Sequence, residues 1–335
     1  DRSFVAEHTY EMVRWWALLW GLLGEEPTTK RKDLQKLFGV YWLWRGFDLP
    51  DWPKFDAVRG IDVEERLSAL SGTATLESYA HWFDEESRKQ LGTKWDTIAR
   101  AMNIPNAVNL RVNTLKSSEE NVLIELNNAG LEVQPHPVFD KALVLKGRPR
   151  LNNLEGFKTG RFEVQDAGSQ SIAPFLNPKP GSTVIDACAG AGGKTLHLGA
   201  LMKNDGKLIA MDVEGRKLGE LLKRTQRSGL TIVQTRAWEE PGVLDELSNS
   251  ADYVLLDVPC SGSGVIKREP DTKWKLQPEH LDRLESVQFS IIRDYSRLLK
   301  IDGIMVYATC SILPKENRLQ VDAFLAHPAG AQFEL

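Results

Sequence analysis

From about residue 166 to the end, the sequence alternates short apolar runs with segments long enough to form helices. Strands separated by helices usually pair in parallel, because each right-handed helical crossover returns the chain to the same end of the sheet. Five runs have the length of strands, at residues 183–186, 208–212, 231–235, 253–257 and 304–309. The sequence therefore predicts an α/β fold with a mostly parallel sheet in residues 166–335.

Three of these runs end in an aspartate, at Asp186, Asp212 and Asp257. In an open parallel sheet, the carboxyl ends of the strands border the crevice that binds the ligand. A single aspartate at such a position can instead cap the helix that follows it. Together, the three carboxylates predict a polar ligand site at this edge of the sheet.

A glycine-rich loop follows the first of the five runs. Its residues are Cys188, Ala189, Gly190, Ala191, Gly192, Gly193 and Lys194. Glycines permit tight turns and a close approach of the ligand, and the next helix offers unpaired amides at its N-terminus. Asp212, at the end of the second run, is placed to accept hydrogen bonds from ribose hydroxyls. The loop favours a nucleotide-type ligand and is not a P-loop, but a dehydrogenase and a purely structural turn stay open.

Two of the three cysteines follow predicted strands, Cys260 after the fourth run and Cys310 after the fifth. A buried cysteine is usually an inert small hydrophobic residue. Two of them at equivalent strand ends, among small polar residues, favour chemistry instead. A thiolate can act as a covalent nucleophile, which divides one difficult reaction step into two easier ones. One cysteine would form such an adduct, and a second acid–base group would help to resolve it.

The first 165 residues follow other patterns. Residues 1–104 carry apolar residues at helical spacing, which predicts a helical region. Its conspicuous tryptophans are Trp15, Trp16, Trp20, Trp42 and Trp44. Such side chains can stack on RNA bases, but at this spacing we expect them to be core residues. Residues 105–165 combine short strands with a capped helix that starts near Ser118, which predicts a small α/β module.

A basic stretch lies within this module. Between residues 141 and 161, Glu155 is the only acidic residue among six basic ones, which are Lys141, Lys146, Arg148, Arg150, Lys158 and Arg161. The stretch is either a solvated surface loop or a phosphate-binding surface. On the second interpretation, Arg148 and Arg150 contact RNA.

Composition adds limits. The net charge of −4 gives no global signature of nucleic-acid binding, so an RNA partner requires a local patch. Three cysteines cannot form a disulfide framework, and an odd number fits a reducing compartment. The sequence has no uninterrupted apolar run of about 18 residues and no basic-then-apolar leader. We therefore expect a cytoplasmic protein with no membrane span.

The motifs together resemble those of the Nop/Sun family of RNA 5-methylcytosine methyltransferases, and most closely its bacterial members that act on small-subunit ribosomal RNA. The similarity extends over nearly the whole chain. The motifs that carry it are residues 110–116, 162–166, 169–170, 186–195, 257–264, 268–271, 273–274, 306–311, 314 and 316–317. The Pro-Cys pair at Cys260 and the Thr-Cys pair at Cys310, in this order, are the most specific part of the match.

The resemblance implies a Rossmann-like class I methyltransferase domain that binds S-adenosyl-L-methionine and uses no metal. It implies that Cys310 is the nucleophile and that Cys260 assists breakdown of the covalent adduct. The loop from Cys188 to Lys194 would cradle the methionine part of the cofactor, and Asp212 would hold its ribose. Asp257, with Lys194, would contact the target cytosine. The helical region 1–104 is similar to the tail of a NusB-like domain, which implies docking to RNA.

Two departures from the family pattern stand out. The third strand of the family normally leads to an aspartate that contacts adenine, whereas this chain has residues 235–239 without an aspartate. Trp238 is our candidate to stack on adenine instead. The strands that follow residues 316–317 in the family also have no counterpart here, so we expect a sheet that lacks them.

Other functions stay open from the sequence. The chain could modify tRNA rather than ribosomal RNA, or could bind RNA as a non-catalytic ribosome assembly factor. DNA cytosine methyltransferases share the chemistry, but they use the Pro-Cys thiol as the nucleophile, and the Thr-Cys motif favours RNA.

Overall fold

The computed structural model describes residues 2–238 and 240–335, so Asp1 and Glu239 lie outside the described residues. The chain forms two compact units. The first contains Asp1–Pro105, Ser261–Arg283 and Ser311–Lys315, and the second contains Asn106–Cys260, Leu284–Cys310 and Glu316–Leu335. Two segments from the second half of the chain thus belong to the helical unit. The division into domains at residues 1–104, 105–165 and 166–335 stays a prediction.

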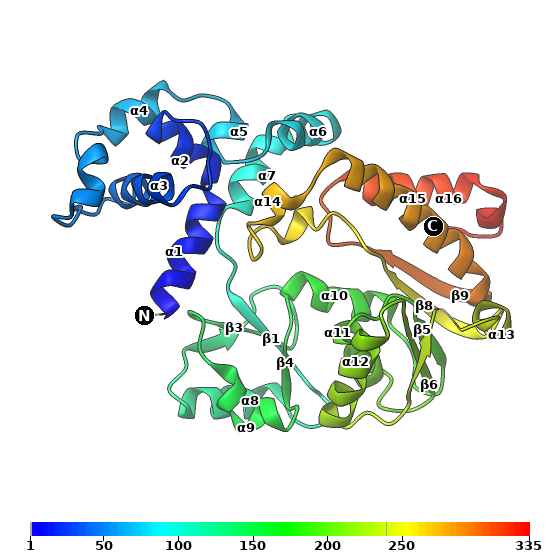
Figure 1. Cartoon of the computed structure of the whole chain (residues 1–335). Helices are drawn as coiled ribbons and strands as arrows, with labels where there is room; N and C mark the ends of the chain where they lie inside the picture. The colour runs from blue at the N-terminus through cyan, green and yellow to red at the C-terminus, as the bar shows by residue number, and fades with distance from the viewer. Residues whose placement is uncertain (1, 239) are drawn as a thin grey trace. The chain divides into compact units, whose positions relative to one another are not determined.

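The first unit is helical in its described residues (Figure 1). Its elements are α1 (Arg2–Arg14), α2 (Trp16–Leu23), α3 (Arg31–Trp44), η1 (Pro53–Val58), α4 (Val63–Ala69), α5 (Thr73–Leu76), α6 (His81–Leu91), α7 (Lys94–Met102), η3 (Ser263–Val265) and α14 (Thr272–Lys275). The core role expected for the tryptophans is confirmed. Trp20 is 2% exposed, the rings of Trp15 and Trp44 meet edge to face at 5.2 Å, and Trp16 and Trp42 pack against the same apolar cluster.

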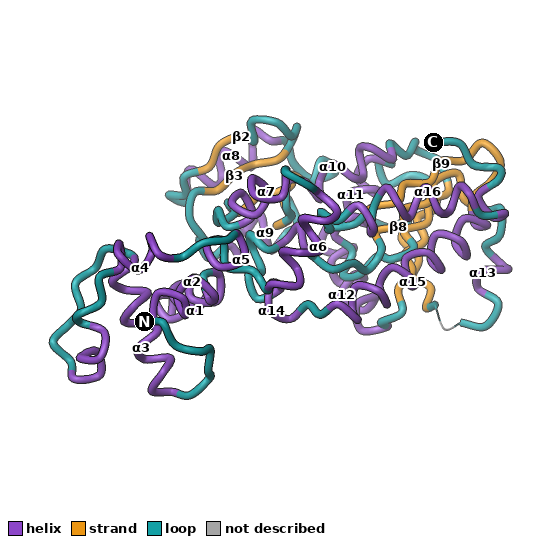
Figure 2. Tube along the Cα trace, turned by 90° about the horizontal axis from the view of Figure 1, so that it is seen from above, coloured by secondary structure: helices purple, strands orange, loops and turns teal. Residues whose placement is uncertain are grey.

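The second unit contains two separate sheets, which Figure 2 shows as two groups of strands. The smaller sheet has the order β2-β3-β1-β4, with every pairing antiparallel. Its elements are β1 (Val108–Val112), α8 (Glu119–Asn128), β2 (Val133–Pro135), β3 (Ala142–Leu145), η2 (Leu151–Asn153), α9 (Glu155–Lys158) and β4 (Phe162–Val164). The predicted helix cap is confirmed, because the Ser118 side chain accepts a hydrogen bond from the Asn121 amide.

The larger sheet has the order β7-β6-β5-β8-β9, and all its pairings are parallel, as predicted. Its strands are β5 (Thr183–Asp186), β6 (Lys207–Asp212), β7 (Val233–Ala237), β8 (Ala251–Asp257) and β9 (Leu299–Ala308). The remaining helical elements are α10 (Ala167–Leu176), α11 (Gly193–Leu201), α12 (Gly215–Ser228), α13 (Val243–Glu246), α15 (Pro278–Tyr295), η4 (Ser296–Leu298), η5 (Pro314–Glu316), α16 (Arg318–Ala326) and η6 (Pro328–Gly330). Helix α15 begins in the first unit and ends in the second.

Several predicted strand boundaries were wrong, among them the start of β8, which begins at Ala251 rather than at residue 253. Strand β7 begins at Val233, two residues later than predicted, because Val233 pairs with Leu208 of β6. Strand β9 begins at Leu299, five residues earlier than predicted. Leu299 already pairs with Ala251, and the register then shifts before Ile304 pairs with Tyr253. The two parts of β9 lie on either side of this irregularity. Because the irregularity interrupts the strand pattern, the sequence did not indicate the first part.

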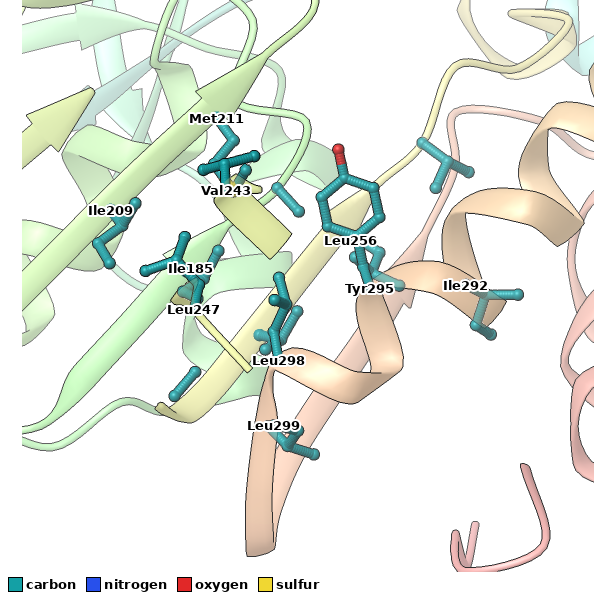
Figure 3. Packing of buried hydrophobic residues seen from close by; sticks show 14 of the residues in the cluster. Ile185, Ile209, Met211, Val243, Leu247, Leu256, Ile292, Tyr295, Leu298 and Leu299 are labelled. Atoms are coloured by element: carbon teal, nitrogen blue, oxygen red, sulfur yellow. The ribbon is translucent and has the colours of Figure 1, made fainter. Parts of the chain in front are cut away.

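Helices cover both faces of the parallel sheet. On one face, α13, α15 and α16 contribute Val243, Ile292, Tyr295 and Phe324 to a cluster with strand residues such as Ile209, part of which is seen in Figure 3. The other face packs against α10 and α11 and against α12. Because both faces are covered, the central strands carry unbroken apolar runs, such as residues 253–256 of β8. The carboxyl ends of the strands are the part left free for a site.

Candidate active site

The glycine loop joins β5 to α11 in a conformation that requires glycine. Gly192 precedes the first residue of α11 with a φ of +88°, a region that other residues rarely adopt. A Cβ atom there would lie 2.7 Å from Cγ of Leu221 in α12. Gly190 also has a positive φ, +54°, but a Cβ atom on it would meet nothing within 4 Å. The loop is thus packed tightly against α12 at Gly192 and is open at Gly190.

Asp212 fixes the open side of this loop. Its Oδ2 atom accepts a hydrogen bond of 2.9 Å from the Gly190 amide, and its Oδ1 atom accepts one of 2.8 Å from the Glu214 amide. Two lone pairs remain on the carboxylate, so Asp212 can still accept bonds from a ligand's hydroxyls. The structure therefore brings the predicted ribose-binding residue to the predicted cofactor loop.

Trp238 lies beside the backbone of Asp212. Its amide donates a 3.3 Å hydrogen bond to the Asp212 carbonyl. Its ring stacks on Tyr295, with ring centroids 5.3 Å apart and planes 23° apart, and the side chain stays 36% exposed. One face of the indole is therefore supported by Tyr295, a residue whose place in the site no sequence pattern indicated.

Two arginines that were not predicted as site residues also hold the loop. Arg111 of β1 is buried and donates a 2.6 Å hydrogen bond to the Gly193 carbonyl and another to Gln165. Arg224 of α12 donates to the Ala191 carbonyl at 2.8 Å. Burial lowers the pKa of Arg111 to about 10, which leaves it charged at neutral pH. The only sequence signal for Arg111 was its place in a family motif.

Asp186 is the most deeply buried of the three strand-end carboxylates. Its Oδ2 atom accepts a 2.7 Å hydrogen bond from the Thr195 hydroxyl, while Oδ1 has no partner among the described residues. Burial raises the pKa of Asp186 to about 7, and the nearby charge of Asp257 adds to the increase. Asp186 is thus poorly suited to touch a ligand directly and braces the start of α11.

Lys194 and Asp257 form an ion pair between α11 and the end of β8. Both side chains are partly exposed, with 15% and 27% of their surface accessible. They also act electrostatically on the thiol of Cys310, Asp257 raising its pKa and Lys194 lowering it. The two residues predicted to contact the substrate therefore lie next to the predicted nucleophile.

Cys260 and Cys310 follow two neighbouring strands and face each other as free thiols. Their sulfur atoms are 3.1 Å apart, well beyond the disulfide bond length of about 2.05 Å. The Cys310 amide also donates to the Cys260 sulfur at 3.2 Å. The hydrogen bond from Cys260 is the main reason that the pKa of Cys310 lies below its ordinary value, although partial burial opposes this effect. A thiol with a lowered pKa is the reactive kind.

The third cysteine behaves differently. Cys188 packs against the apolar cluster on one face of the parallel sheet. Burial raises the pKa of its thiol, and the carboxylates of Asp186, Asp257 and Asp212 raise it further. Cys188 is therefore an unreactive thiol whose contribution to the loop is its backbone and its packing.

The predicted RNA contacts lie elsewhere in the second unit. Arg148 and Arg150 are exposed and lie between β3 and η2, on the antiparallel sheet rather than on the sheet that carries the cysteines. Three other members of the basic stretch are engaged in ion pairs, Lys141 with Asp140, Lys146 with Glu132 and Arg161 with Glu125. The structure thus divides the stretch into these paired residues and the exposed Arg148, Arg150 and Lys158.

Two other kinds of site have no counterpart within residues 2–238 and 240–335. No helix there is long and apolar enough to cross a membrane. No group of three or more His, Cys, Asp or Glu side chains there is arranged to hold a metal ion.

Known proteins are similar to this chain in both sequence and fold. A protein from Synechocystis sp. called probable ribosomal RNA small subunit methyltransferase B is 35% identical in an alignment that covers 97% of this chain and 81% of that protein. The chain belongs to the RsmB/F methyltransferase family. The family's 16S rRNA methyltransferase RsmB/F model matches residues 173–334, and its ferredoxin-like domain model matches residues 79–151. The expected kinship with Nop/Sun enzymes is thereby confirmed.

Two further comparisons complete this assignment. A probable ribosomal RNA small subunit methyltransferase B from Bacillus subtilis is 34% identical, and the alignment covers 82% of this chain but 60% of that protein. The solved structure of a methyltransferase homolog protein from Pyrococcus horikoshii has a TM-score of 0.67 and 30% identity, covering 77% of this chain and 83% of that one. The glycine loop and both facing cysteines lie within the matched RsmB/F methyltransferase domain, whereas Arg148 and Arg150 lie within the matched ferredoxin-like domain.

Proposed function

We propose that this protein transfers a methyl group from S-adenosyl-L-methionine to carbon 5 of a cytosine in small-subunit ribosomal RNA, with Cys310 as the nucleophile. The observation that carries the proposal is the pair of free thiols at the ends of β8 and β9, with sulfur atoms 3.1 Å apart. Family membership supports RNA as the substrate, because the relatives are called ribosomal RNA small subunit methyltransferases.

The residues at the ends of β5 and β6 fit a nucleoside-type cofactor. The backbone is open at Gly190, Asp212 keeps acceptor capacity beside it, and Trp238 offers a partly exposed aromatic face. In the proposed arrangement, the loop from Cys188 to Lys194 holds the methionine part, Asp212 the ribose and Trp238 the adenine. When bound, S-adenosyl-L-methionine supplies a methyl group that is activated by attachment to a positively charged sulfur.

Cys310 performs the first step of the proposed chemistry. Its thiolate adds to carbon 6 of the cytosine, a C–S bond forms, and the electrons of the C5–C6 double bond become available at carbon 5. Carbon 5 would then take the methyl group with this electron pair, while the bond from the methyl group to the positively charged sulfur breaks and its electrons stay on that sulfur, which leaves as a neutral thioether. Lys194 and Asp257, which are paired beside the thiol, are positioned to bind the polar edge of the cytosine and to keep it in place.

Cys260 is assigned to the second step, the resolution of the adduct. The proton on carbon 5 passes to water, its C–H electrons restore the C5–C6 double bond, and the C6–S bond breaks with its electrons returning to the Cys310 sulfur. A hydrogen bond from the Cys260 thiol stabilises the departing thiolate. The same contact lowers the pKa of Cys310 in the free protein, which supports this role.

The residues that bind the RNA backbone differ from those that act on the target base. A cytosine must leave its stack before carbon 6 can reach a thiol. We assign phosphate contacts to the exposed Arg148 and Arg150. Replacing both with glutamine should weaken RNA binding and reduce the slope of its salt dependence by about 0.7–0.9 for each phosphate that the protein no longer neutralises. An unchanged slope of the salt dependence would show that these arginines do not contact RNA phosphates.

The test of the proposed reaction is methyl transfer from radiolabelled S-adenosyl-L-methionine to purified small-subunit ribosomal RNA, followed by nucleoside analysis. We expect label in 5-methylcytosine with the wild type and none with Cys310→Ala. Transfer RNA is the parallel substrate, and label confined to it would replace ribosomal RNA in the proposal. Binding of ribosomal RNA without methyl transfer to either RNA would instead support an assembly factor.

A further inference from the structure

Gln288 of α15 is a buried polar residue that the proposed chemistry does not use. Its side chain is 0% exposed, and its Nε2 atom donates two hydrogen bonds of 2.9 Å. One acceptor is the carbonyl of Pro259, the residue that precedes Cys260. The other is Oε1 of Glu316, which follows Cys310 by six residues and is also fully buried. A single amide group thus connects the two segments that flank the cysteine pair.

The orientation of this amide follows from its partners. A carbonyl and a carboxylate oxygen are both acceptors, so the amide nitrogen must face them. The Gln288 oxygen has no hydrogen-bond partner among the described residues. An unpaired buried oxygen costs free energy. The amide of Gln288 therefore keeps its two donor bonds although this orientation leaves its oxygen without a partner among the described residues.

The Glu316 side of the bridge is anchored to β9. The Tyr307 hydroxyl donates a 2.9 Å hydrogen bond to the Glu316 carbonyl. One residue further along, the Asn317 side chain accepts a 2.6 Å hydrogen bond from Thr309, the neighbour of Cys310. The segment that Gln288 contacts is therefore hydrogen-bonded to two residues just before Cys310, Tyr307 and Thr309. On the other side, Pro259 is exposed, and its carbonyl bond to Gln288 attaches the Cys260 loop to this frame.

We propose that Gln288 is a positioning residue that sets the location of Cys260 relative to Cys310, an inference that rests on the proposed function of the two thiols. Because Cys260 acts on the departing thiolate, a displaced Cys260 loop slows the release of RNA more than the formation of the adduct. Displacements near 1 Å in a catalytic arrangement change rates by up to about 100-fold. Loss of the bridge should therefore imitate, in weaker form, the loss of the Cys260 thiol.

The experiment compares Gln288→Met with Gln320→Met. Gln320 is a matched control, because it is also buried and its Nε2 donates a 3.1 Å hydrogen bond to the backbone carbonyl of Glu285, a residue that adjoins neither cysteine in the sequence. Each full-length variant is mixed with small-subunit ribosomal RNA and S-adenosyl-L-methionine, and the protein–RNA adduct is followed on a denaturing gel. We expect Gln288→Met to accumulate adduct, with release slowed about 10- to 100-fold and formation changed much less. If Cys260→Ala accumulates adduct in the same assay, equal adduct levels in the two glutamine variants would overturn the proposal.

A second measurement needs no RNA and tests the positioning role of Gln288 separately from the proposed function of the two thiols. The rate at which iodoacetamide alkylates Cys310 is measured against pH by mass spectrometry. Without the bridge, the Cys260 thiol stabilises the Cys310 thiolate less. The pH midpoint of Cys310 alkylation should therefore rise in Gln288→Met, whereas it should not change in Gln320→Met. An unchanged midpoint would overturn the positioning role. Absence of an adduct with Cys260→Ala, together with a shifted midpoint, would overturn the proposed function alone.

The milder Gln288→Asn variant protects this test against misfolding. Its side chain keeps the amide but is one methylene shorter, so it cannot reach both Pro259 and Glu316 from the same backbone position. If Gln288→Met lacks the wild-type circular dichroism spectrum, the same two results are required of Gln288→Asn. A folded Gln288→Asn with wild-type adduct release and a wild-type midpoint would overturn the proposal.

Discussion

The change Gly192→Ala tests how the cofactor loop is held. Two separate costs arise at this position. The first is the backbone conformation, since φ is +88° and alanine in the left-handed region costs about 1–2 kcal/mol. The second is steric, because the new Cβ atom would lie 2.7 Å from Cγ of Leu221 and 3.3 Å from its Cβ. Overpacking of this kind costs about 1–3 kcal/mol. We therefore expect the free energy of unfolding to fall by about 2–5 kcal/mol.

Gly190→Ala is the matched control two residues earlier. Its φ of +54° is also positive, but a Cβ atom there meets nothing within 4 Å. It should cost only about 1–2 kcal/mol, which is the conformational part. Because the open space at Gly190 is where we place the cofactor, this variant should instead weaken the binding of S-adenosyl-L-methionine. The two substitutions thus separate packing from binding within one loop.

The assay is urea unfolding monitored by circular dichroism, combined with calorimetric titration of S-adenosyl-L-methionine. The double variant Gly192→Ala with Leu221→Ala removes the steric clash, so its drop in stability should be about 1–3 kcal/mol smaller than the sum of the two single drops. Equal destabilisation by Gly190→Ala and Gly192→Ala, with additive behaviour in the double variant, would refute the packing argument.

Three further predictions concern buried and reactive groups. Because the folded pKa of Asp186, about 7, exceeds the unfolded value of about 3.9, its contribution to stability is present below pH 4 and is lost as pH rises to 7. Asp186→Asn should therefore flatten the pH dependence of urea unfolding between these values, and an unchanged slope would argue against a buried acid. Since the pKa of Cys310 is lowered chiefly by Cys260, alkylation of Cys310 should have its midpoint at lower pH than alkylation of an ordinary cysteine, and Cys260→Ala should raise that midpoint; no difference between the variants would contradict the thiol contact. Arg111→Lys removes the guanidinium whose Nη1 atom donates to the Gly193 carbonyl of the cofactor loop and to Gln165. It should lower the free energy of unfolding by about 1–3 kcal/mol, whereas the exposed Arg150→Lys should leave it nearly unchanged; similar urea midpoints for both would refute the brace.

The parallel sheet and its site were largely predictable because their signals are local. Apolar runs that end in Asp186, Asp212 and Asp257 give both the strands and the edge at which they meet, since parallel strands share one carboxyl end. The same rule brings Cys260 and Cys310 together from positions 50 residues apart in the sequence. No knowledge of tertiary contacts was needed for these predictions.

Other features depend on contacts that no local pattern encodes. The Lys273 ammonium donates to the Arg14 carbonyl, 259 residues away, and to the Asn103 side chain, and so a short segment of the second half belongs to the helical unit. Arg111, Tyr295 and Gln288 act on the site from elements that looked like ordinary strand or helix in the sequence. Their roles follow from burial and from the direction of single hydrogen bonds or ring contacts, which spacing alone does not reveal.

The central claim is that Cys310 attacks the cytosine and Cys260 helps to release it. The most direct test is covalent trapping on small-subunit ribosomal RNA with S-adenosyl-L-methionine, comparing wild type, Cys260→Ala and Cys310→Ala on a denaturing gel. We predict that Cys260→Ala accumulates a protein–RNA adduct and that Cys310→Ala forms none. An adduct that accumulates with Cys310→Ala and is absent with Cys260→Ala would make Cys260 the nucleophile and contradict the mechanism proposed for this pair of thiols.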